Sequence, residues 1–133
     1  MQKIQIKIPS LMENIRIVES FIDNAKEKFN INDDLYGNIM IAVTESVNNA
    51  IQHGNKHDKN KNVNLSLDVF EDKIKFTIED EGIGFDYKLL PDPTSPENIE
   101  KVNGRGIFLM QQLSDKLDFS DDGKKVELEF KML

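Results

Sequence analysis

Alternating apolar and polar positions predict five β-strands along this chain. Apolar residues recur at every second position in each of them, as Ile4, Ile6 and Ile8 do near the N-terminus. A two-residue period gives a strand one apolar and one polar face. We therefore expect a sheet that helices cover on one face and that water reaches on the other. The expected strands are residues 2–8, 63–69, 73–79, 117–119 and 126–130.

Helical periodicity predicts three helices in the remaining segments. The first is preceded by Ser10, which together with Glu13 has the spacing of a capping box. The second follows Asn32, a residue type that is favoured at the N-cap position. It ends before Gly54-Asn55, which is a plausible C-cap. The expected helices are about residues 11–29, 33–53 and 105–116.

Residues 86–103 have no clear periodicity, although they separate a strand from a helix. They contain Pro91, Pro93 and Pro96. A loop of this length inside a small domain is usually a functional lid or a disordered segment. The polar segment 55–62, in contrast, is expected to be an ordinary solvated loop.

Composition and charge narrow the classes of function. The 133 residues are enough for one domain, and 38% hydrophobic and 31% charged residues are ordinary for a globular protein. A net charge of −7 disfavours binding to nucleic-acid phosphates or to a membrane surface. There is no cysteine, no apolar run near the roughly 18 residues of a membrane helix, and no apolar N-terminal signal. We expect a cytoplasmic protein.

The second predicted helix carries two polar residues that fit phosphoryl chemistry. Glu45 and Asn49 are one turn apart, so they share a face. A carboxylate can accept the proton of an attacking hydroxyl, and an amide oxygen is a suitable ligand for Mg²⁺. Asn48 is an alternative ligand, but the spacing favours Asn49. By itself, this pattern is more typical of the solvated face of an amphipathic helix, opposite the apolar arc of Tyr36, Ile39, Met40, Val43, Val47, Ala50 and Ile51.

A glycine motif with an acidic residue follows the strand 73–79. Asp80 could accept a hydrogen bond from an exocyclic amine, which adenine carries at the position where guanine has a carbonyl oxygen. Gly82 and Gly84 would let the backbone pass close to a base, because they have no Cβ. The alternative is a common glycine-rich turn, and the motif alone does not decide between the two.

A second glycine motif, Gly104-Arg105-Gly106, opens the third predicted helix. Backbone N–H groups at a helix start form a ready phosphate site, and Arg105 would either touch phosphate or be exposed. The alternative is a simple Gly-x-Gly turn. The motif is not a P-loop, since no Gly-Lys-Ser/Thr sequence follows.

In this order and spacing, the three motifs resemble those of the GHKL (Bergerat-fold) ATPases, which include gyrase-type and histidine-kinase ATP domains. The resemblance covers nearly the whole chain and is greatest to the small bacterial anti-sigma-factor serine/threonine kinases. Glu45 and Asn49 match the N-box of the family, Asp80, Gly82 and Gly84 match its first glycine box, and Gly104 and Gly106 match its second.

The resemblance implies a two-layer α/β (α+β) sandwich, with a mixed, mostly antiparallel sheet of about five strands and three helices on one face. It implies one kinase domain over residues 1–133, with an ATP lid at about 86–103. Glu45 would be the catalytic base and Asn49 the Mg²⁺ ligand. The implied nucleotide-binding residues are Asn49, Asp80, Gly82, Gly84, Gly104, Arg105 and Gly106.

The implied function is a partner switch. Such a kinase sequesters a sigma factor and phosphorylates a STAS-type antagonist of that inhibition, using ATP and Mg²⁺, and the family often forms homodimers. Two alternatives remain: a non-catalytic ATP-binding module, and a histidine-kinase-like ATPase domain. The chain departs from the family near its last hairpin, where Lys124 and Lys125 stand in the region of a threonine that helps many members to bind nucleotide.

Overall fold

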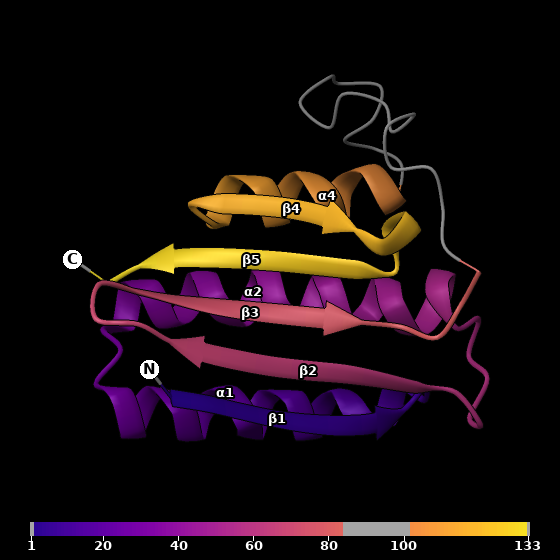
Figure 1. Cartoon of the computed structure of the whole chain (residues 1–133), viewed down its shortest axis with the longest axis horizontal. Helices are drawn as coiled ribbons and strands as arrows, with labels where there is room; N and C mark the ends of the chain where they lie inside the picture. The colour runs from indigo at the N-terminus through magenta and orange to yellow at the C-terminus, as the bar shows by residue number, and fades with distance from the viewer. Residues whose placement is uncertain (1, 84–101, 133) are drawn as a thin grey trace.

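The protein is a two-layer sandwich of one sheet and one layer of helices. Its structure, a computed structural model, describes residues 2–83 and 102–132, with only the backbone described for 102–105. The sheet has the strand order β1-β2-β3-β5-β4 (Figure 1). Its strands are β1 (Gln2–Pro9), β2 (Asn62–Val69), β3 (Lys73–Glu79), β4 (Lys116–Ser120) and β5 (Lys125–Lys131). The main helices are α1 (Ile15–Phe29), α2 (Asp33–Asn49) and α4 (Val102–Leu113).

Every strand pairing in the described part of the chain is antiparallel, so the expected mixture is not seen there. The reason is the position of β5. The strands β3 and β4 run in the same direction, but β5 lies between them and pairs with both (Figure 1). The connection from β3 through α4 therefore returns the chain to the sheet edge without creating a parallel pair.

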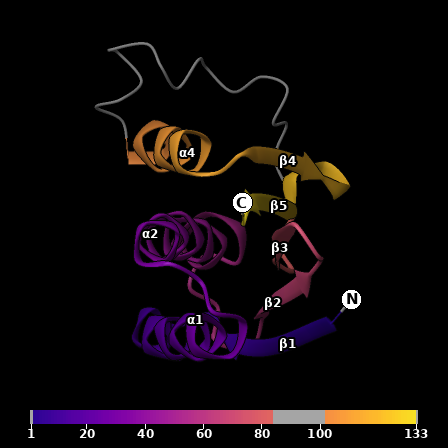
Figure 2. The ribbon, with the colours of Figure 1, turned by 90° about the vertical axis from the view of Figure 1, so that its left-hand side faces the viewer.

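The three helices lie side by side on one face of the sheet, as expected (Figure 2). The core lies between the two layers, where Phe76 and Phe130 pack edge to face with ring centroids 6.0 Å apart. The opposite face of the sheet is polar and carries cross-strand ion pairs such as Lys75–Glu127, at 3.4 Å. The alternating pattern thus predicted both faces correctly. No helix in the described ranges is long and apolar enough to span a bilayer.

Local signals at the helix ends were only partly right. Asn32 is the N-cap of α2 and accepts a hydrogen bond from the Leu35 N–H at 2.8 Å, as predicted. The capping box at Ser10 is wrong: Ser10 is buried directly after β1, and its hydroxyl donates to the carbonyl of Lys61, just before β2, at 2.6 Å. A short 3₁₀ turn, η1 (Met12–Asn14), precedes α1 instead.

Candidate functional site

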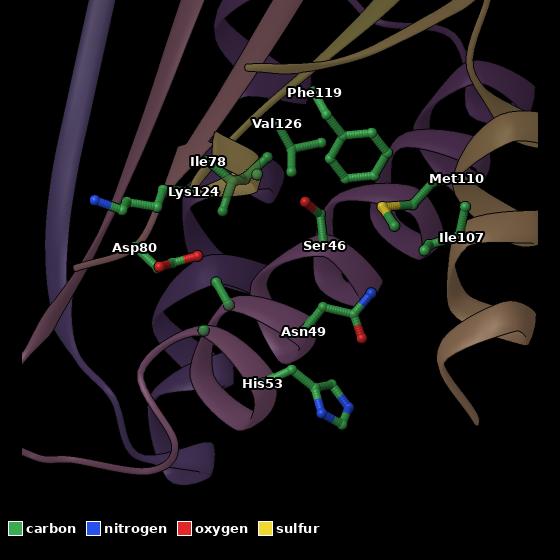
Figure 3. Close-up of a pocket in the computed structure, with 13 residues that line it drawn as sticks. Ser46, Asn49, His53, Ile78, Asp80, Ile107, Met110, Phe119, Lys124 and Val126 are labelled. Carbon is green, nitrogen blue, oxygen red and sulfur yellow. The ribbon is translucent and has the colours of Figure 1, made fainter. Parts of the chain in front are cut away.

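A cavity of about 190 Å³ lies where the C-terminal part of α2 meets α4 and one end of the sheet. Figure 3 shows side chains from both layers around it. Its wall is mainly apolar, with a few polar groups from α2, from the end of β3 and from the last hairpin. The lining residues are Ser46, Asn49, Ala50, His53, Gly54, Ile78, Asp80, Ile107, Met110, Phe119, Gly123, Lys124 and Val126.

Helix α2 changes its winding at this cavity. Its last turn continues into a π-helical turn, η2 (Ala50–Gly54). Such turns are rare and occur frequently at functional sites. The wider turn carries His53 and Gly54 into the cavity wall, so that the end of the helix reaches the loop that follows β3.

Two glycines allow this close approach of helix and loop. A Cβ atom on Gly54 would lie 2.4 Å from Oδ2 of Asp80, and one on Gly82 would lie 2.0 Å from the carbonyl oxygen of Gly54. Real Cβ atoms do not come so close, so a side chain at residue 82 would collide with backbone, and one at residue 54 would displace the Asp80 carboxylate. The sequence suggested a C-cap at Gly54-Asn55, and Asn55 is indeed the C-cap of η2. Both glycines also serve a close contact between the protein's own segments, whereas a base near Gly82 stays a prediction.

Asp80 is held at the inner end of this contact. Its backbone N–H donates to the carbonyl of Lys124 at 2.9 Å, and its Oδ1 accepts from the N–H of Gly82 at 2.8 Å. Burial raises the pKa of the Asp80 carboxyl above its ordinary value of 3.8, while the Gly82 hydrogen bond and the nearby Lys124 charge oppose the rise. When ionised, a half-buried carboxylate in an apolar wall can accept a hydrogen bond from a group in the cavity.

Asn55 ties the loop after β3 to the rest of the molecule. Its side chain is 1% exposed and donates to the Ser10 hydroxyl at 2.7 Å and to the Asn62 carbonyl at 3.0 Å. Its Oδ1 accepts from the N–H of Glu81 at 2.7 Å. The expectation of a solvated loop over 55–62 is therefore wrong at its first residue. Asn55 fixes the residue next to Asp80 and so positions Asp80 as well.

Glu45 and Asn49 lie on the side of α2 that faces α4. Both are half-buried, so the solvated-face interpretation is wrong. A Cβ atom on Gly106 would lie 3.2 Å from Oε2 of Glu45 and 3.2 Å from Nδ2 of Asn49. Asn49 also lines the cavity, whereas Glu45 lies one turn away from it. The structure thus brings the residues of the first and third motifs into contact.

The second glycine motif lies farther inside its helix than expected. Helix α4 begins at Val102 rather than at about 105, and it ends at Leu113 because β4 starts at Lys116. Gly106 is therefore a full turn into the helix, where its visible role is close packing against α2. Gly104 and Arg105 belong to the first turn, and only their backbone is described. Gly84 and the expected lid, apart from its last two residues, lie outside the described ranges.

Several lining residues were missed in the reading of the sequence. Ile78, Phe119 and Val126 were assigned to the core, and Ser46 was not considered, because periodicity does not tell a core position from a cavity wall. Figure 3 shows the Ser46 hydroxyl pointing from α2 toward Ile78 and Val126. Asn49 and Asp80 of the motifs line the cavity, but only tertiary contacts identify its apolar wall.

Lys124 and Lys125, the two lysines of the last hairpin, lie on different sides of the sheet. Lys124 lines the cavity, and Figure 3 shows its ammonium group pointing away from Ser46. Lys125 is the first residue of β5, pairs with Glu79, and faces the polar side of the sheet. Only Lys124 therefore stands at the site. The hairpin turn itself is left-handed at Asp121, Asp122 and Gly123, the last with φ of 85°.

Comparison with known proteins gives consistent matches. The family described as "Histidine kinase-like ATPase domain" matches residues 8–130. Serine-protein kinase RsbW of Bacillus subtilis (strain 168) is 29% identical over 120 residues, which cover 86% of this chain and 75% of the relative. The protein of the same name from Staphylococcus aureus (strain Newman) is 30% identical over 121 residues, covering 86% and 76%.

A solved structure supports the fold. The RsbU and RsbW domains of a Mycobacterium tuberculosis protein superpose with a TM-score of 0.68 at 12% identity. The match covers 98% of this chain and 32% of that chain, so this chain spans about a third of the larger protein. Together these matches confirm the resemblance that the three motifs indicated.

Proposed function

Because this chain belongs to the histidine kinase-like ATPase domain family, we propose that it is an ATP-dependent serine/threonine protein kinase. The observation that carries the proposal is the arrangement of Asp80, Asn49 and Glu45. The first two line one cavity from opposite sides, and the third lies one turn from Asn49 in contact with α4. This order gives a site with a base end at Asp80 and a phosphate end at Asn49 and Glu45.

The base end suits adenine. Ile78, Phe119 and Val126 offer an apolar wall for a flat ring. The carboxylate of Asp80 accepts a hydrogen bond from the exocyclic amine of adenine. Guanine presents a carbonyl oxygen at the same place, so its lone pairs would face the carboxylate oxygens. A buried polar group that loses its partner costs about 1–3 kcal/mol, which is enough for selection of ATP over GTP.

The phosphate end suits phosphoryl transfer. The Asn49 side-chain oxygen would hold Mg²⁺, which neutralises charge on the phosphates. Glu45 accepts the proton of the attacking hydroxyl. The hydroxyl oxygen forms the new bond to the γ-phosphorus, the bond to the bridging oxygen breaks, and ADP leaves. Close packing of Gly106 against both side chains holds them at this end.

We further propose that residues 1–133 act as one kinase domain in the cytoplasm, in a partner switch. The hydroxyl would come from a serine or threonine of a STAS-type antagonist, and the protein that is sequestered would be a sigma factor. The support is the similarity over most of the chain to relatives named serine-protein kinases, together with a site that has both a base end and a phosphate end.

The test is transfer of the labelled γ-phosphate of ATP, in the presence of Mg²⁺, to a purified STAS-type protein. We expect acid-stable labelling of that protein and none without Mg²⁺. Binding of ATP without any transfer would favour a non-catalytic sequestering module. Label that is lost in acid would indicate phosphohistidine, and with it a histidine-kinase-like ATPase domain. Absence of ATP binding in calorimetry would overturn the proposal as a whole.

A further inference from the structure

The hydroxyl of Ser46 is buried in the cavity wall without a hydrogen-bond partner. Ser46 is 2% exposed, and no acceptor or donor for its Oγ exists among the described residues. Two other hydroxyls, one in α2 and one directly after α4, behave differently. Thr44 donates to the Met40 carbonyl at 2.6 Å, and Ser114 donates to the Met110 carbonyl at 2.5 Å. Such bonding to the carbonyl four residues back is the usual way to satisfy a hydroxyl on a helix.

In the free protein, the apolar surroundings of the Ser46 hydroxyl do not stabilise it. The hydroxyl points toward the side chains of Ile78 and Val126, with Met110 also in the wall (Figure 3). A buried polar atom without a partner destabilises a fold, so alanine would suit this position better. A ligand in the cavity that bonds to the hydroxyl would remove this cost.

The polar groups of the cavity differ in the hydrogen bonds that they can form with a nucleotide base. Asp80, when ionised, only accepts hydrogen bonds. Asn49 lies at the phosphate end, and His53 is exposed at the rim. Figure 3 shows the Lys124 ammonium pointing away from Ser46. Among the lining residues that the structure describes, Ser46 is thus the buried side chain that can donate a hydrogen bond at the base end.

We propose that Ser46 determines base specificity together with Asp80, by donating a hydrogen bond to a ring nitrogen of adenine next to the amine. In adenine, the amine is flanked by the acceptors N1 and N7. The base edge therefore presents one hydrogen-bond donor beside one acceptor. Asp80 accepts from the donor, and Ser46 donates to the acceptor. The inference rests on the proposed ATP site.

The test is a thermodynamic cycle that compares the binding affinities of two proteins for ATP and for two ATP analogues. Wild type and Ser46→Ala are titrated with ATP, 1-deaza-ATP and 7-deaza-ATP, in which N1 or N7 is replaced by a CH group. We expect wild type to bind one analogue about tenfold more weakly than ATP, the effect of one lost hydrogen bond. Ser46→Ala should bind ATP about tenfold more weakly than wild type and should not distinguish ATP from that analogue.

Two controls separate base recognition from folding. Thr44→Val removes a hydroxyl of the same helix that is already bonded to the backbone, and its ATP affinity should equal that of wild type. The melting temperature of free Ser46→Ala should be equal to that of wild type or higher, since the variant loses a hydroxyl without a partner. Weaker ATP binding in a protein of equal stability is an effect that a purely structural role would not produce.

Two results would overturn the inference while leaving the ATP site in place. One is an unchanged ATP affinity in Ser46→Ala. The other is a loss of ATP affinity with wild-type discrimination against both analogues. Wild-type protein that binds no adenine nucleotide would instead overturn the proposed function, and the role of Ser46 with it.

Discussion

The two ends of the proposed site are held in place by different means. At the base end, Asp80 depends on two segments far from it in the sequence: the turn η2 with its buried C-cap Asn55, and the last hairpin. At the phosphate end, Glu45 and Asn49 share one helix, and their geometry follows from its period. Contacts across the fold therefore position Asp80, the proposed adenine-binding residue, whereas the helix itself places the proposed catalytic base Glu45 beside Asn49. A change can consequently disable one end and spare the other.

The largest effect is expected from a substitution at the phosphate end. Glu45→Gln keeps the shape of the side chain and removes the base, so phosphoryl transfer should fall by roughly 10²–10⁴-fold while ATP affinity stays near that of wild type. Single-turnover transfer and calorimetry measure the two quantities. Asn49→Ala is the contrasting variant: it should weaken Mg²⁺-dependent ATP binding itself. Transfer by Glu45→Gln at the wild-type rate would remove Glu45 from the mechanism.

The base end should be disrupted by a substitution that separates the backbone segments around Asp80. A methyl group at Gly82 collides with the carbonyl of Gly54, so Gly82→Ala should lower the free energy of unfolding by about 2–3 kcal/mol and abolish ATP binding. Gly37→Ala is the matched control, because Gly37 lies in α2 and a methyl group there would meet no atom within 4 Å. It should stabilise the protein by about 0.5–1 kcal/mol. Urea denaturation of both variants and wild type measures these changes in stability. A midpoint of Gly82→Ala equal to that of wild type would contradict the tight contact.

The smallest effect concerns the charge on Asp80. Burial raises the pKa of its carboxyl above 3.8, so the folded protein binds this proton at a higher pH than the unfolded chain. The contribution of Asp80 to the free energy of unfolding is therefore present below pH 3.8 and lost as the pH rises through the folded-state pKa. At pH 7, free Asp80→Asn should melt at a higher temperature than wild type, because no buried charge remains.

The same substitution should weaken ATP binding by about tenfold or more, because the new amide group would face the amine of adenine. In wild type, ATP affinity should fall as the pH drops through the raised pKa of Asp80, whereas the affinity of Asp80→Asn should not depend on pH in this range. Calorimetry across that range, with Mg²⁺ constant, measures both. A parallel pH dependence in the two proteins would assign the titration to another group.

A structural feature could be predicted from the sequence where it depends on residues that are near one another in the chain. The period of two predicted the strands and both faces of the sheet, and Asn32 predicted the start of α2, because side-chain direction and capping depend on neighbouring residues. The capping box at Ser10 failed, because its hydroxyl is bonded instead to a carbonyl far along the chain. Glu45 and Asn49 were found by spacing, but only contact with α4 showed that they do not face solvent.

The sequence by itself determined the family and the layered fold, and it suggested the residues proposed for acid–base and metal chemistry. Tertiary structure decided three other matters: that Gly54 and Gly82 allow a close approach of η2 and the loop after β3, that Asn55 anchors that loop beside Asp80, and that the Ser46 hydroxyl is left without a partner. The physical reason is the range of the interactions. Periodicity and capping act within a few residues, whereas steric fit and the satisfaction of buried polar groups depend on segments that meet only after folding.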